Sequence, residues 1–194
     1  MSLVAAAGKD PSTLSTRGAK FDDLHRGGWD PKAREADQDR DKVVAEIIYP
    51  SVGMVLCNHP DFAYKRACFD AYKRWLKDFR DGLPDRLYSM PQIVMETPES
   101  GIEEIRNAKD RGFKGVMRPG NPGHEDYHHK DYDRFWDAVV EMEMPVSFHI
   151  LASKNNNLRD YRGPKINAFQ TIIRGTRISS GRLFLVVCLN AIPS

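Results

Sequence analysis

Apolar residues follow two different spacings, which alternate along the chain. Short apolar runs typical of strands alternate with longer stretches in which apolar residues recur every three or four positions, as in helices. The predicted strands are 43–49, 87–94, 113–117 and 145–150. The predicted helices are 31–41, 60–79, 97–111, 132–140 and 164–175. This order predicts an α/β fold with a parallel sheet and helices outside it, either an open doubly wound sheet or a barrel.

Local signals set the helix ends and their inner faces. Asp30 before Pro31 and Thr97 before Pro98 are typical of helix starts, and Gly112 is typical of a helix end. The second helix has an apolar stripe, and Trp75 in it and Trp136 in a later helix are predicted to lie in the core by their spacing. The stripe consists of Ala67, Cys68, Ala71, Tyr72, Trp75, Leu76 and Phe79.

The last predicted strand places a histidine where an α/β barrel carries its chemistry. Alternate residues of a strand face opposite sides, so Val146, Phe148 and Ile150 are expected to face the helices. Ser147 and His149 are then expected to face the barrel interior. Barrel active sites lie at the carboxyl ends of the strands, which makes His149 a candidate for a functional role.

Composition narrows the class of protein. The chain has 194 residues, 41% of them apolar and 29% charged, which is typical of one globular domain. A net charge of +2 without a Lys/Arg block argues against nucleic acid as a partner. No apolar run reaches the roughly 20 residues that span a bilayer, and no signal peptide is evident. Cys57, Cys68 and Cys188 have neither metal nor redox spacing, which favours a reducing cytoplasm.

Many short blocks, in order, resemble amidohydrolase-related family 2, which includes the aminocarboxymuconate-semialdehyde decarboxylase group. The resemblance extends over about 20–176. The blocks are GGWDPKAREADQDRDKVVAEIIYPSVGM (27–54), CFDAYKRWLKDF (68–79), PDRLYSMPQI (84–93), GFKGVMRP (112–119), YDRFWDAVVEMEMPVSFH (132–149) and FQTII (169–173).

The resemblance implies a metal-dependent (β/α)₈ barrel that hydrolyses or non-oxidatively decarboxylates a small carboxylated substrate. The family site uses an H-x-H or E-x-H pair, a histidine on the fifth strand, a later histidine and an aspartate. His149 matches the fifth-strand histidine, and the other positions have no counterpart here. We therefore expect a partial TIM barrel of about four to five β/α units, a fragment whose intact site holds a divalent metal such as zinc. Because a catalytic zinc needs about three protein ligands, the chain alone is expected to hold metal weakly, if at all, and to be inactive.

Three other sites have a functional and a plainer interpretation. Arg118 ends a strand and is a candidate to bind a substrate carboxylate, or it is a surface residue at the strand end. The segment 124–128 matches the metalloprotease motif H-E-x-x-H, but Gly and Pro precede it, so we expect a solvated loop in which His124, His128 and His129 line the rim. Glu46 lies among apolar strand residues and needs a partner that the sequence does not identify.

The ends of the chain depart from the pattern. We expect residues 1–28 to form a loop or disordered arm, 29–176 the partial barrel, and 177–194 a divergent tail. One choice of codons for the tail, read in a shifted frame, gives a family-like sequence ending in GVFERHPK, so we expect it to be translated out of frame. The alternative function is therefore a truncated, non-catalytic remnant. A partial barrel exposes sheet edges and apolar surface, so self-association to a homo-oligomer is expected.

Deleting residues 177–194 tests the out-of-frame hypothesis. A tail that was never selected to pack on the barrel should contribute nothing to folding, and its run Leu183–Leu189 is apolar, uncharged and prone to aggregate. We expect unchanged or improved solubility and an equally cooperative unfolding transition, followed by circular dichroism. A large loss of folded signal would instead mean that the tail is a genuine strand.

Overall fold

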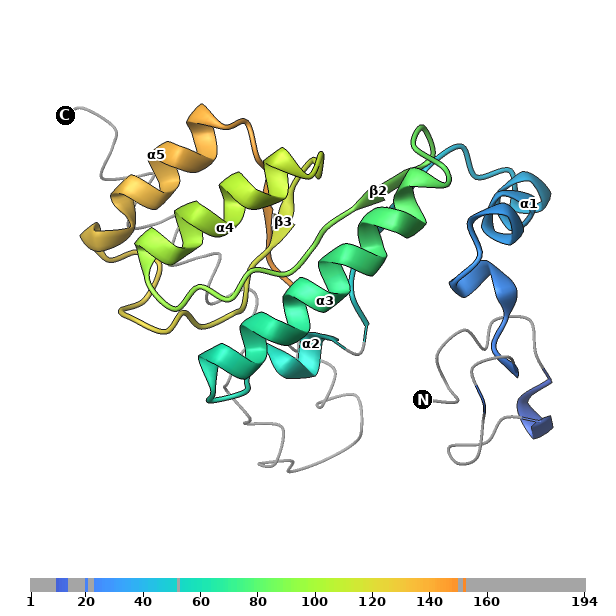
Figure 1. The fold of residues 1–194 in the computed structure, drawn as a ribbon, viewed down its shortest axis with the longest axis horizontal. Helices are drawn as coiled ribbons and strands as arrows, with labels where there is room; N and C mark the ends of the chain where they lie inside the picture. Colours follow the sequence, from blue (N-terminus) through green and yellow to red (C-terminus); the bar gives the residue numbers. More distant parts are fainter. Residues whose placement is uncertain (1–9, 14–19, 21–22, 52, 150–151, 153–194) are drawn as a thin grey trace, which may run out of the picture.

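The computed structural model describes residues 10–13, 20, 23–51, 53–149 and 152 (Figure 1). The predicted helix 164–175 and the tail 177–194 lie outside these residues. The described helices are η1 (Pro11–Thr13), η3 (Arg26–Gly28), α1 (Pro31–Asp41), α2 (Gly53–Leu56), α3 (Phe62–Asp81), α4 (Pro98–Asp110), η4 (Lys130–Tyr132) and α5 (Asp133–Glu141). The described strands are β1 (Glu46–Ile48), β2 (Leu87–Ser89), β3 (Val116–Met117) and β4 (Val146–Ser147).

The strands are parallel and follow one another in chain order. β1 pairs with β2 and β3 pairs with β4, both in parallel. A parallel bridge between Gln92 and Met117 joins the two pairs. α3 connects β1 to β2, α4 connects β2 to β3, and α5 connects β3 to β4. The predicted parallel sheet with connecting helices is thus confirmed for the described residues.

The strands are shorter than the sequence predicts because proline interrupts the ladder. Pro91 follows β2 and Pro145 precedes β4, and neither can donate a backbone hydrogen bond. At the start of the first predicted strand, the Val43 amide donates to the Gln38 carbonyl of α1 instead of to a strand.

The predicted helix caps are present. The Asp30 side chain accepts hydrogen bonds from the backbone N–H groups of Lys32 and Ala33 at the start of α1. Thr97 and Ser100 exchange side-chain and backbone hydrogen bonds at the start of α4, which is a capping box. Gly112 follows α4 with a φ of +78°, a conformation that favours glycine.

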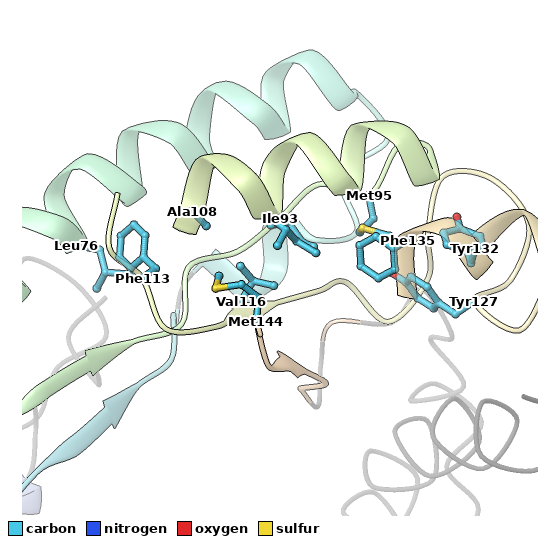
Figure 2. Packing of buried hydrophobic residues seen from close by; sticks show 11 residues of the cluster. Leu76, Ile93, Met95, Ala108, Phe113, Val116, Tyr127, Tyr132, Phe135 and Met144 are labelled. Atoms are coloured by element: carbon cyan, nitrogen blue, oxygen red, sulfur yellow. The ribbon is translucent and has the colours of Figure 1, made fainter. Parts of the chain in front are cut away.

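The main core lies between the sheet and helices α3, α4 and α5 (Figure 2). Of the described strands, β3 contributes a buried member, Val116, while Ile48 of β1 and Val146 of β4 pack against the core. Its buried members are Leu76, Ile93, Met95, Ile105, Ala108, Phe113, Val116, Tyr127, Tyr132, Phe135 and Met144. Trp136 packs against this core as predicted.

The predicted apolar stripe of α3 is confirmed for Leu76 and Phe79, which are buried, and is wrong along its other edge. Ala67 and Ala71 are exposed and Trp75 is 40% exposed, whereas Lys65 and Lys73 are buried. Lysine can pack its aliphatic stem against apolar neighbours while its ammonium finds a polar partner. The Lys65 Nζ donates to the Cys57 carbonyl at 3.2 Å and the Lys73 Nζ to the Asp70 carboxylate at 3.4 Å, which lets the buried face of α3 include two lysines.

A further burial prediction is wrong. Val44 is 83% exposed and Ile47 is 62% exposed, although the segment 43–49 is apolar enough to predict a buried strand. Glu46 does find its partner, because Arg34 of α1 places Nη2 2.6 Å from its carboxylate, which is only partly buried.

The sheet curves so that its first and last strands approach each other. β1 and β4 are separated by two strands, which would place them roughly 14 Å apart in a flat sheet. Tyr49, just after β1, nevertheless shares a hydrogen bond of 2.8 Å between its Oη and the Oγ of Ser147 in β4. The carboxyl ends of the strands therefore bend toward one face, on which both side chains lie.

A buried carboxylate holds the segment that follows β2. Glu104 of α4 is 6% exposed and accepts hydrogen bonds from the backbone N–H groups of Val94 at 2.6 Å and Met95 at 3.4 Å. Arg66 of α3 forms an ion pair with the same carboxylate at 2.7 Å. Met95 has a φ of +55°, which is unfavourable for a side-chain-bearing residue. Glu104 therefore fixes a strained turn at the strand end and ties α3 to α4.

Replacing Glu104 tests this role. Glu104→Ala leaves two backbone donors and the Arg66 charge without their acceptor, so we expect a loss of about 3 kcal/mol in the free energy of unfolding. Glu103→Ala, one residue away on the exposed side of the same helix, should change it by less than about 0.5 kcal/mol. Urea unfolding of both variants measures the difference, and equal losses would contradict the role.

A double-mutant cycle tests the contact between β1 and β4. Tyr49→Phe and Ser147→Ala should each cost about 1 kcal/mol of unfolding free energy. The double variant should cost less than the sum, since the two groups share one hydrogen bond. Tyr88→Phe, on the neighbouring strand β2, serves as the matched control and should be nearly neutral. Strict additivity would show that the hydrogen bond does not contribute to closing the sheet.

Candidate active site

His149 lies just after β4, on the face of the sheet opposite the helices. Val146 packs against the core under α4 and α5, as predicted, while Ser147 bonds Tyr49 on the other face. The imidazole of half-buried His149 and the Tyr49 ring have centroids 5.5 Å apart, with their planes tilted by 49°. His149 and Ser147 therefore share the inner face, at the carboxyl ends of the strands where barrel sites form.

Strand alternation separates two sets of residues at these ends. Ile93 and Val116 belong to the helix-side core, whereas Val94 and Met117 belong to a second cluster with Cys57. Tyr49 packs against this second cluster. The second cluster thus provides an apolar setting beside the polar group of Tyr49, Ser147 and His149.

Arg118 is buried with the helix-side residues. Its side chain is 0% exposed, and its guanidinium carbon lies 3.3 Å from the ring centroid of Phe148 and 3.5 Å from that of Tyr127. Its Nη1 donates to the Pro119 carbonyl at 3.0 Å. Burial lowers the pKa of this guanidinium from its usual value. Arg118 is therefore not a residue at the strand surface, and the structure places it beside Phe148 while His149 lies beside Tyr49.

The histidine-rich segment forms a loop and not a helix. Residues 120–129 consist of turns, bends and irregular backbone, so His124 and His128 lack the shared helical face that the H-E-x-x-H chemistry requires. His124 Nε2 lies 2.9 Å and His129 Nδ1 3.3 Å from the Asp131 carboxylate. The hydrogen bond from His124 lowers the pKa of Asp131. The predicted solvated loop is confirmed, and its histidines pair with carboxylates.

The described residues offer one of the donors that a catalytic metal needs. Among them, no three His, Cys, Asp or Glu side chains are grouped as metal ligands. His149 supplies one imidazole, and a catalytic divalent ion usually takes about three protein ligands. The fit to a metal is therefore partial within the part of the chain that the structure describes, where His149 could hold one position of a divalent ion.

Sequence reasoning missed the polar residues that surround the strand ends. Gln92, at the bridge to β3, donates its Nε2 to the Gly53 carbonyl at 2.8 Å and lies 3.1 Å from the Cys57 sulfur. Burial raises the pKa of Cys57 to about 11, which makes this thiol a poor nucleophile. The position of Tyr49 at a strand end could have been predicted, because Tyr49 ends an apolar run just before Pro50. Its hydrogen bond to Ser147 could not, because the two residues are far apart in the sequence.

Among the described residues, no helix is long and apolar enough to cross a membrane.

A model of the amidohydrolase family matches residues 22–171. That range contains the described strands, the helices between them, and both His149 and Arg118.

Solved structures of amidohydrolases and decarboxylases share the fold. An amidohydrolase from Mycobacterium avium subsp. paratuberculosis K-10 is similar at a TM-score of 0.70 and 20% identity, over 95% of this chain and 50% of that one. A second similar structure is a 5-carboxyvanillate decarboxylase from Novosphingobium aromaticivorans DSM 12444, solved with manganese and 4-hydroxy-3-methoxy-5-nitrobenzoic acid. Its TM-score is 0.63 and its sequence identity 22%, over 78% of this chain and 43% of that one. A 2,6-dihydroxybenzoate decarboxylase from Rhizobium is similar at a TM-score of 0.62 and 20% identity, over 78% of this chain and 49% of that one.

These likenesses imply the (β/α)₈-barrel fold, of which the described residues show four parallel strands and their helices. The chain spans about half the length of these solved proteins. The family model covers most of the chain, and the arrangement of strands and helices agrees with it. This protein belongs to the amidohydrolase family, in the branch known as amidohydrolase-related family 2.

Proposed function

We propose that the strand ends of this chain carry part of the active site of a metal-dependent carboxy-lyase. The reaction is the non-oxidative decarboxylation of a small carboxylated aromatic acid. In it the bond from the ring carbon to the carboxylate carbon breaks, carbon dioxide leaves, and a proton takes its place. The observation that carries the proposal is the position of His149 on the inner face at the carboxyl end of β4.

The substrate class rests on the relatives. The two decarboxylases described above act, by their names, on 5-carboxyvanillate and 2,6-dihydroxybenzoate, and both are carboxylated aromatic rings. This favours decarboxylation over the hydrolysis that the family also performs. Arg118 is proposed to bind the acid group, since a guanidinium matches a carboxylate with two parallel hydrogen bonds.

His149 is proposed as a metal ligand. The tilted Tyr49 ring lies against its imidazole, and the Tyr49 phenol is in turn bound to Ser147. Fixing an imidazole in this way favours one ring orientation for coordination. A divalent ion supplies Lewis acidity when bound. The family resemblance favours zinc, whereas the 5-carboxyvanillate decarboxylase was solved with manganese. We therefore propose that the divalent metal is either zinc or manganese.

A non-catalytic protein is the second candidate function. It is favoured by one observation, the lack of any group of three His, Cys, Asp or Glu ligands among the described residues. Such a protein would keep the family fold, and His149 would then be a residue of the inner face only.

Paramagnetic Mn²⁺ tests the ligand role even if binding is weak. Added below one equivalent to ¹⁵N-labelled protein, it should broaden the backbone resonances of Tyr49, Ser147 and His149 before any others. His149→Ala should remove this selectivity, while His59→Ala, a histidine next to the cap of α3, should keep it. Broadening that starts at the exposed carboxylates in both variants would contradict a metal site at His149.

Carbon dioxide release from 2,6-dihydroxybenzoate then separates the two candidate functions. Release that requires Mn²⁺ and is lost in His149→Ala would support the carboxy-lyase. Selective broadening at His149 without any release would support the non-catalytic protein.

A further inference from the structure

Arg118 is fully buried, and one edge of its guanidinium has no hydrogen-bond partner among the described residues. Phe148 covers one side of the guanidinium plane at 3.3 Å and Tyr127 lies against it at 3.5 Å, measured from the guanidinium carbon to the ring centroids. The aromatic rings attract the cation, and they also prevent a partner from stacking on it. A hydrogen-bond acceptor can then reach Arg118 only in the plane of the guanidinium.

Within that plane, one nitrogen has a hydrogen-bond partner among the described residues and two have none. Nη1 donates to the Pro119 carbonyl at 3.0 Å, a carbonyl that also accepts from the Tyr127 hydroxyl at 2.8 Å. Nε and Nη2 are buried and have no hydrogen-bond partner within the described residues. These two nitrogens form the side of the guanidinium that presents two parallel N–H groups, the fork that a carboxylate accepts with both oxygens.

The open edge is costly as it stands. A buried charge normally has an ion pair or a full set of hydrogen bonds, because removing it from water costs several kcal/mol. Arg118 has no ion pair with a carboxylate in the part of the chain that the structure describes. A second buried donor lies close by: the Tyr132 hydroxyl also lacks a partner there, and its ring centroid is 5.2 Å from that of Tyr127 (Figure 2).

We propose that the Nε and Nη2 edge of Arg118 is a binding site for a planar oxyanion, held by two parallel hydrogen bonds in the plane between Phe148 and Tyr127. The site deepens the proposed function, since the acid group of a carboxylated substrate has this chemistry. A free small oxyanion such as formate or bicarbonate has it too. Because the edge is closed to solvent, size should separate these two sources.

Thermal unfolding of the full chain with added anions tests the site. In about 0.1 M sodium formate the melting temperature should exceed that in sodium chloride of equal ionic strength by about 3–8 °C. A parallel series with 2,6-dihydroxybenzoate identifies the source. A shift with both anions assigns the edge to a substrate carboxylate, and a shift with formate alone assigns it to a small free oxyanion. No shift beyond chloride with either anion overturns the proposal.

Matched variants assign the effect to the fork. Arg118→Met is similar in volume and lacks the fork, so the formate-specific shift should vanish. Arg118→Lys keeps the charge without the two parallel donors and should lose more than half of the shift. Arg106→Met removes an exposed arginine of α4 and should keep the whole shift. An equal shift in Arg118→Met and the unaltered protein would overturn the proposal.

A measurement on the unaltered protein covers the case in which Arg118 variants fail to fold. The Nε–H resonance of Arg118 should move to higher proton frequency on addition of formate, and not on addition of chloride. An Nε–H resonance that stays unchanged at saturating formate would overturn the proposal. Neither this measurement nor the unfolding series requires a metal or turnover, so the site can stand or fail separately from the carboxy-lyase.

Discussion

β3 is only two residues long, and it is hydrogen-bonded on both sides. On one side, the Met117 amide donates to the Pro91 carbonyl and the Met117 carbonyl accepts from Ile93. On the other side, Val116 and Arg118 donate to the carbonyls of Pro145 and Ser147. This short segment joins the β1–β2 pair to β4, so the positions of all the candidate site residues depend on it.

Close packing protects this junction. Gly115 directly precedes β3, and a Cβ atom there would lie 2.8 Å from the Pro145 carbonyl oxygen and 2.8 Å from the Met90 side chain. Backbone atoms cannot yield at that distance, so the approach of β3 to β4 requires glycine. The sheet therefore gains its order from a few well-placed backbone groups, supported by the helix-side core.

Two buried charged residues stand at the strand ends, and they differ in how well they are satisfied. Glu104 accepts from two backbone N–H groups and pairs with Arg66, so its burial fastens α3, α4 and the end of β2 together. Arg118 has one hydrogen bond and two aromatic contacts, and two of its nitrogens have no hydrogen-bond partner within the described residues. The first arrangement is what a structural role requires. The second arrangement leaves a buried charge incompletely satisfied by the described residues, and the oxyanion site proposed above rests on it.

The order of the elements, the caps at Asp30 and Thr97, the end at Gly112 and the inward side of Ser147 could all be predicted from the amino-acid sequence. These depend on neighbouring residues and on a strand period of two, which local physical chemistry decides. The tertiary structure decided which side of α3 is buried, because helical spacing permits several orientations and lysine stems can pack as well as alanine. It also decided the enclosure of Arg118 and the contact of Tyr49 with Ser147, 98 residues away, since both depend on how the sheet curves.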